Sequence, residues 1–333
     1  MAYGESAAVT HEEVRLAVAL SGAAQLASVL EAFAFEETWF PYVFLGTVTL
    51  QSLPGLAFGA EDAPAGAAVQ LAADALSLGN YALFGDNYVN PLLFNAAHKF
   101  SMYRTYALYA DLRSRCAGDA YASSFSGRSF LELVSAPFRP SVLGEPYVWG
   151  TIATVAAVTA VSVATSDQSR AVWATGKCHL NDAEIPLWAG VSLSLLSTVV
   201  NYVLTGVGEE SLYRGVYYEE TKTTCGPVAA KILDANYFVL SHYPQQYGTL
   251  TKTEIGTVIL NYALSLGNAL WLQCVYDWGG LPASVAVHAW NDVLFGMADW
   301  LLAAGVPYLN DAGFDLMTST RAGVTISWRA KLP

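Results

Sequence analysis

Two glutamates and an arginine stand together in a part of the chain that otherwise lacks charge. The segment reads Glu209-Glu210-Ser-Leu-Tyr-Arg214, and the uncharged run 185–208 leads directly into it. Ionisable side chains within a membrane segment cost roughly 2.5 to 3.5 kcal/mol each on insertion scales, so they are seldom present without a function. The cluster therefore indicates chemistry carried out within a bilayer.

The spacing of these residues predicts how they pair. On a helix, Glu210 and Arg214 share one face because they are four residues apart, so they can form an ion pair. Glu209 then points away from this face and is left unpaired. Desolvation disfavours the charged form of such a carboxylate, so it takes up a proton readily, as a general base must. Capping of a helix after Gly206-Val-Gly208 is the alternative interpretation.

Two histidines follow in similarly apolar surroundings. His242 ends the sequence Phe238-Val-Leu-Ser-His242, in which Phe238 and His242 share a helical face. His288 precedes Asn291 and Asp292 at spacings of three and four, so all three can face one cavity. A helix-capping His242 and a buried structural pair of His288 with Asp292 are the alternative interpretations.

The composition favours a membrane protein. Of 333 residues, 54% are hydrophobic and only 13% are charged, about half the charged share of an ordinary soluble domain. The net charge of -12 argues against a phosphate-binding surface, and therefore against a nucleic-acid partner. The four cysteines have no paired short spacing, which argues against a disulfide framework or a zinc knuckle.

Four stretches in the second half are long and apolar enough to cross a bilayer core, which needs about 20 helical residues. They are 146–166, 186–208, 255–276 and 281–306. Segments 209–220 and 228–243 are too short and too polar to span alone. We expect them to form helices that pack inside the bundle or enter it partway.

The two ends of the chain are less strongly patterned. The first 140 residues predict either further membrane helices, with 16–30 and the proline-interrupted 38–60 as candidates, or an amphipathic helical layer on the membrane surface. Near the other end, 323–329 alternates as a strand would. We therefore expect an all-α, polytopic membrane bundle with short broken or re-entrant motif helices and, at the C-terminus, a small β-hairpin or an extended end.

The three motifs, EExxxR, FxxxH and HxxxN or HxxxD, resemble in this order those of the CPBP family. This family comprises the type II CAAX prenyl endopeptidases and their bacterial relatives, often called the Abi family. The resemblance covers roughly 147–306. It divides the chain into a helical region 1–140 in the membrane or on its surface, a CPBP-like membrane core 141–308 and a tail 309–333.

The resemblance implies an intramembrane endopeptidase that acts on a membrane-bound protein or peptide, in a bacterial inner (cytoplasmic) membrane. Glu209 would activate a water molecule, with Glu210 and Arg214 ordering it. His242 would hold or deprotonate that water. His288, with the residue four positions on, would stabilise the oxyanion formed when the water attacks a peptide carbonyl.

One residue departs from the family pattern. The prenyl endopeptidases have asparagine where this chain has Asp292, and an ionised aspartate cannot donate a hydrogen bond to an oxyanion. Asp292 could be protonated, could orient His288, or could leave the donor role to adjacent Asn291. HxxxD variants resemble members of the broader bacterial family.

Other mechanisms and functions fit the same residues. A catalytic zinc ion could be held by Glu209, His242, His288 and Asp292. The prenyl endopeptidases look glutamate-dependent instead, so we expect no cofactor and rank zinc second. Two alternatives to an enzyme are a non-catalytic immunity or scaffold protein of the same fold and a proton-coupled transporter that uses Asp292 and Asp299.

Overall fold

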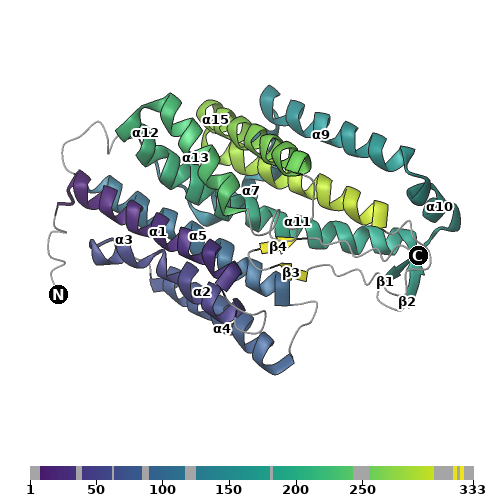
Figure 1. Ribbon diagram of the computed structural model, residues 1–333, viewed down its shortest axis with the longest axis horizontal. Helices are drawn as coiled ribbons and strands as arrows, with labels where there is room; N and C mark the ends of the chain where they lie inside the picture. Colours follow the sequence, from purple (N-terminus) through teal and green to yellow (C-terminus); the bar gives the residue numbers. More distant parts are fainter. Residues whose placement is uncertain are drawn as a thin grey trace.

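The protein is a helical bundle with two small antiparallel hairpins (Figure 1). The computed structural model describes residues 8–34, 40–61, 64–84, 90–116, 125–180, 183–242, 255–303, 318–320 and 323–325. Within these ranges helices predominate, which confirms the predicted all-α membrane bundle.

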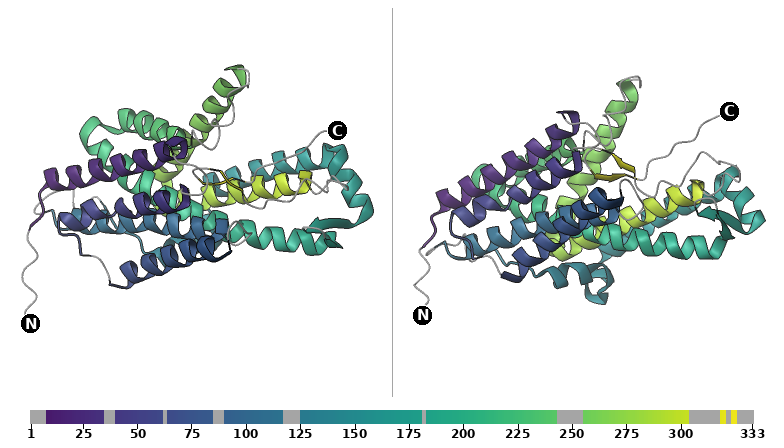
Figure 2. Two further views of the ribbon diagram at one scale, coloured as in Figure 1. Left: turned by 60° about the horizontal axis from the view of Figure 1, so that its bottom comes forward. Right: turned by 90° about the horizontal axis from the view of Figure 1, so that it is seen from below.

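The amino-terminal helices lie together on one side of the bundle (purple to blue in Figures 1 and 2). They are α1 (His11–Ala34), α2 (Phe40–Leu50), α3 (Leu53–Ala57), α4 (Pro64–Phe84) and α5 (Asn90–Ser114). Helix α5 packs against α1, α2, α3 and α4 and also along the long helix α11. It therefore connects the amino-terminal helices with the rest of the bundle.

The second half of the chain contains the longest helices. Its elements are α7 (Phe130–Ser135), η1 (Ala136–Phe138), α8 (Pro140–Leu143), α9 (Pro146–Thr165), α10 (Asp167–Thr175), β1 (Lys177–Leu180), β2 (Ala183–Pro186), α11 (Leu187–Leu212), η2 (Tyr213–Tyr218), α12 (Glu219–Cys225), α13 (Pro227–Ser241), α15 (Ile255–Ala303), β3 (Thr318–Thr320) and β4 (Gly323–Thr325). Strands β3 and β4 pair antiparallel, which confirms the predicted C-terminal hairpin. The hairpin of β1 and β2 was not predicted from the sequence.

Three helical segments are long and apolar enough to cross a membrane among the residues that the structure describes. They are His11–Glu31, Pro146–Thr165 and Leu187–Cys225. The first supports a membrane helix within the amino-terminal region. The two halves of α15, which we also expected to span, are not among these segments.

Segment 209–220 is not the separate short helix that we expected. It continues α11 through the π-helical turn η2 into α12. The sequence has no proline between Pro186 and Pro227, and the chain turns only at Gly226, where φ is 78°. With no residue to break it, one helix carries the acidic pair and the arginine.

Helix α15 is broken where the sequence predicts two segments. Gly280 has a φ of 69°, a conformation that side chains with a Cβ rarely adopt, and Pro282 follows it. The half after Gly280 carries His288. The break gives this half its own direction, independent of 255–279.

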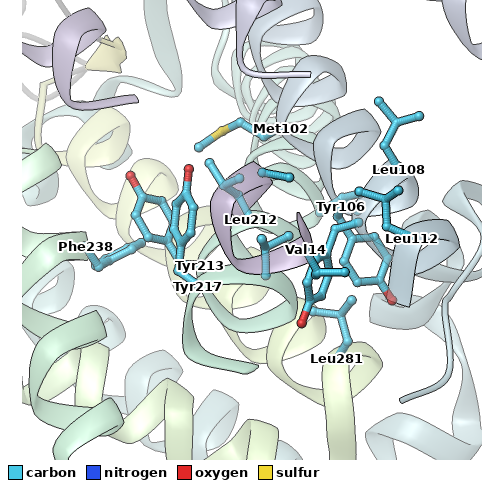
Figure 3. Packing of buried hydrophobic residues seen from close by; sticks show 14 of the residues in the cluster. Val14, Met102, Tyr106, Leu108, Leu112, Leu212, Tyr213, Tyr217, Phe238 and Leu281 are labelled. Carbon is cyan, nitrogen blue, oxygen red and sulfur yellow. The ribbon is translucent and has the colours of Figure 1, made fainter. Parts of the chain in front are cut away.

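One hydrophobic core draws side chains from both halves of the chain. Figure 3 shows Val14 from α1, Tyr106 from α5, Leu212 from α11, Phe238 from α13 and Leu281 from α15 in this core. All five side chains are buried. Helices α1 and α5 are therefore packed into the same core as the motif helices.

Two glycines allow neighbouring helices to approach α11 just before the acidic pair. A Cβ atom at Gly206 would lie 3.1 Å from the carbonyl oxygen of Val285 in α15. A Cβ atom at Gly208 would lie 2.7 Å from the carbonyl oxygen of Lys99 in α5 and 2.8 Å from its Cα. The contact at Gly208 leaves no room for a methyl group unless the backbone of one helix moves.

We therefore expect Gly208→Ala to destabilise the protein by about 1–3 kcal/mol, the usual cost of overpacking. Gly267→Ala is the matched control, because Gly267 is also helical and no heavy atom lies within 4 Å of its Cβ position. Alanine favours helix over glycine, so the control should unfold at the same temperature or higher. Thermal unfolding in detergent micelles measures the stability of both variants. An unfolding midpoint of Gly208→Ala equal to that of the wild type would contradict the close approach of α5 to α11 at Gly208.

Candidate active site

The acidic pair and the arginine lie inside the bundle at the end of α11 and the start of η2. The Glu210 and Arg214 side chains are fully buried, and Arg214 Nη1 lies 3.0 Å from Glu210 Oε1. Arg214 Nη2 also donates to the carbonyl oxygen of Ala269 at 3.1 Å. The predicted pairing of Glu210 with Arg214 is confirmed.

Glu209 faces the two motif histidines. Its Oε2 atom lies 3.4 Å from His242 Nε2 and 3.6 Å from His288 Nε2. These residues come from α11, the end of α13 and the second half of α15. Three separate helices thus bring one carboxylate oxygen and two imidazole nitrogens together.

His288 lies between several carboxylates. Its Nδ1 is 2.6 Å from Glu210 Oε1, and its Nε2 is 3.3 Å from Asp292 Oδ2. Ser284 Oγ donates to the other oxygen of Glu210. Because ionised carboxylates only accept hydrogen bonds, a hydrogen on each ring nitrogen of His288 satisfies this environment. Of the three alternatives for Asp292, the geometry favours the one in which it orients His288.

The orientation of His242 is fixed by the helix that it ends. Its Nδ1 lies 2.7 Å from the carbonyl oxygen of Phe238, which can only accept, so Nδ1 carries a hydrogen. In the neutral ring, Nε2 then presents a lone pair toward Glu209. Ser241 also contacts Nδ1 at 3.2 Å and accepts a hydrogen bond from Tyr213 at 2.7 Å.

Phe238 forms an aromatic wall beside the site. Its ring centroid lies 4.5 Å from that of His242 and 6.1 Å from that of His288. The guanidinium carbon of Arg214 lies 4.4 Å from the centroid of the same ring. Phe238 therefore contacts all three motifs.

Asn291 stands apart from this cluster in the contacts that the structure describes. It is buried, and its Oδ1 atom has no hydrogen-bond partner within the described ranges. No described hydrogen bond joins it to Glu209 or to either histidine. Its role as an oxyanion donor stays a prediction.

Lys99 of α5 is the residue that the sequence did not reveal. Its Nζ lies 2.7 Å from Glu209 Oε1, and both side chains are almost completely buried. The expectation that Glu209 is unpaired was therefore wrong. Spacing along one helix reveals partners three or four residues away, whereas Lys99 and Glu209 are 110 residues apart in sequence. The one sequence feature that could have indicated this pair was a lysine inside a largely apolar helix, since such a lysine needs an acidic partner.

The four side chains that the sequence suggested as zinc ligands lie close together, and they contact one another and Lys99. No group of three or more His, Cys, Asp or Glu side chains is arranged to hold a metal ion within the described part of the chain. Glu209 already has a cationic partner in Lys99, and His288 Nε2 faces both Glu209 and Asp292.

Residues 191–294 match the family model described as Type II CAAX prenyl endopeptidase Rce1-like. This match supports membership of the CPBP family, and the matched segment is named the CPBP domain. The match includes Glu209, Glu210, Arg214, His242, His288 and Asp292. No curated protein and no solved structure matches the chain significantly.

The CPBP domain receives contacts from helices outside the matched residues. Lys99 of α5 reaches Glu209, and Gln25 of α1 donates to Tyr213 at 3.3 Å, next to Ser241 and His242. The match to this family indicates a membrane protease. In this chain the surroundings of the motif residues are completed by the amino-terminal helices.

Proposed function

We propose that the CPBP domain is an intramembrane endopeptidase that hydrolyses a peptide bond in a membrane-anchored protein or peptide. The observation that carries the proposal is the convergence of Glu209 Oε2 with the Nε2 atoms of His242 and His288, at 3.4 and 3.6 Å. Peptide hydrolysis needs a water, a base and an anion-stabilising group in a shielded site, and this cluster offers the two protein groups and the burial.

In the proposed reaction Glu209 is the general base. A water molecule that lies beside Glu209 Oε2 and His242 Nε2, in contact with both, gives a proton to Glu209 while its oxygen attacks the peptide carbonyl carbon. The tetrahedral intermediate carries its negative charge on the former carbonyl oxygen, which accepts a hydrogen bond from His288 Nε2 in place of Asp292 Oδ2. Collapse breaks the carbon–nitrogen bond, and the proton on Glu209 passes to the leaving amine.

The exposure of the side chains indicates where a peptide approaches. The His242 and Asp292 side chains are 18% and 29% exposed, whereas those of Glu209 and His288 are 6% exposed. We infer that the peptide enters from the side of His242 and Asp292, with Glu209 at the bottom of the site. The bacterial inner membrane implied by the resemblance stays a prediction.

The test is cleavage by the purified full-length protein in liposomes. Two substrates are used: a farnesylated peptide ending in a CAAX sequence, and the same peptide carried by an apolar transmembrane segment. We expect one internal cut in at least one of them, detected by mass spectrometry. Absence of cleavage of both peptides by folded protein would contradict the proposal.

We further expect the activity to be independent of metal ions. Lys99 supplies the positive charge next to Glu209, so no metal is needed to neutralise that carboxylate. Prolonged treatment with a strong chelator should leave the cleavage rate within about twofold of its starting value, because no Lewis acid takes part. Elemental analysis of the purified protein should find no stoichiometric zinc. Loss of activity on chelation, with recovery on adding zinc, would establish the zinc mechanism instead.

A further inference from the structure

The two oxygens of the Glu209 carboxylate face different partners. Oε1 lies 2.7 Å from Lys99 Nζ, and Oε2 lies on the side of His242 and His288. Glu209 and Lys99 are each only 5% exposed. A charge buried to this degree persists only when it is paired, so Lys99 and Glu209 stabilise one another in their charged forms.

The interface between α5 and α11 fixes the position of Lys99 opposite Glu209. One turn before Lys99, Asn95 Nδ2 donates to Asn201 Oδ1 at 2.7 Å and contacts Thr205 Oγ1 at 3.2 Å. Beside Lys99 itself, Gly208 has no Cβ atom, so the backbones of α5 and α11 can come into contact. The ammonium group is therefore held against Glu209 by a packed interface and by buried polar contacts.

Lys99 counteracts the attraction of the motif histidines for the Glu209 carboxylate. In the described part of the chain, the imidazoles of His242 and His288 also lie close to Glu209, both on the Oε2 side. Without a cation at Oε1, the carboxylate would be drawn toward His288. Such a shift would turn Oε2 away from the position beside His242 Nε2 at which the proposed mechanism places the water.

We propose that Lys99, from a helix outside the family match, is a positioning residue of the active site. It holds Oε1 of Glu209 so that Oε2 stays directed at the attacking water. The charges are consistent with this role: the carboxylates of Glu209, Glu210 and Asp292 face Lys99, Arg214 and a doubly protonated His288. This inference rests on the proposed peptidase function.

The experiment compares Lys99→Met, which removes the charge but keeps much of the volume, with Lys99→Arg, which keeps the charge. For Lys99→Met we expect kcat to fall about 100-fold, the usual effect of a misplaced reacting group. KM should stay within about twofold, because substrate contacts are unchanged. Lys99→Arg should recover at least a tenth of the wild-type kcat, because charge at Oε1 is what the role requires.

Arg113→Met is the matched control. Arg113 is another buried cation of α5, 3.4 Å from Glu219, and Glu219 keeps Lys222 as an ion-pair partner when Arg113 is lost. This variant should keep kcat near the wild-type value. A general weakening of α5 would lower the activity of Arg113→Met and Lys99→Met alike, whereas a positioning role affects Lys99→Met alone.

The outcomes separate this inference from the proposed function. If Glu209→Gln is inactive but Lys99→Met keeps the wild-type kcat, the role of Lys99 is overturned and the peptidase proposal stands. If Glu209→Gln is fully active, Glu209 is not the base and the role of Lys99 fails with it. If the folded wild-type protein cleaves neither peptide, the peptidase proposal itself fails. Should Lys99→Met not fold, Lys99→Gln replaces it, since an amide can donate to Glu209 Oε1. The same fall in kcat is expected, and a wild-type kcat would overturn the inference.

Discussion

Glu209→Gln is expected to lower the rate of peptide cleavage by about 10²- to 10⁴-fold, the contribution of a general base. The amide has the shape of the carboxylate, and its oxygen can still accept a hydrogen bond from Lys99, so the fold should be retained. It cannot take a proton from water at a useful rate. Cleavage of the liposome-bound peptides, followed by mass spectrometry, measures the effect.

Glu220→Gln is the control for this substitution. Glu220 is equally buried and lies on the same continuous helix, but it contacts His11, Arg15 and Tyr109 rather than the motif histidines. The Glu220→Gln variant should cleave the peptides at nearly the wild-type rate. Equal activities for Glu209→Gln and the wild type would rule out Glu209 as the base.

His288→Ala is expected to lower kcat by about 10²- to 10³-fold, the usual result of removing one oxyanion donor. The fold should survive because Glu210 keeps its contacts with Arg214 and Ser284. Size-exclusion chromatography and thermal unfolding check the fold, and the peptide assay measures kcat. His11→Ala, a histidine replaced outside the site, should leave kcat unchanged.

A folded His288→Ala protein with a kcat within twofold of the wild type would remove His288 from the mechanism.

If Glu209→Gln, His242→Ala and His288→Ala all kept the function of the protein in cells, a non-catalytic immunity or scaffold role would replace the peptidase proposal. Transport that depends on Asp299 would favour the carrier, and the side chain of Asp299 lies outside the described residues.

The parts of the site that local spacing determines could be predicted from the sequence. Glu210 and Arg214 pair because they are one helical turn apart. Phe238 and His242 stack for the same reason. The meeting of the three helices was implied by a different signal, since polar groups in apolar segments need one another as partners.

The contacts between distant segments could not be predicted in this way. Lys99 reaches Glu209 from a helix outside the family match, and the packing of that helix against α11 at Gly208 brings it there. Gln25 likewise reaches Tyr213 from α1. The continuation of α11 through η2 was also missed, because the polarity of 209–220 suggested a separate helix while the absence of a helix breaker decided the outcome.

The most direct test of the account is an experimental structure of the protein with a bound peptide aldehyde. The hydrate of such an aldehyde mimics the tetrahedral intermediate of peptide hydrolysis. We predict that one hydrate oxygen lies within about 3.2 Å of Glu209 Oε2 and the other within about 3.2 Å of His288 Nε2. An aldehyde bound away from these side chains, or joined covalently to a different residue, would contradict the glutamate-activated water at the centre of this account.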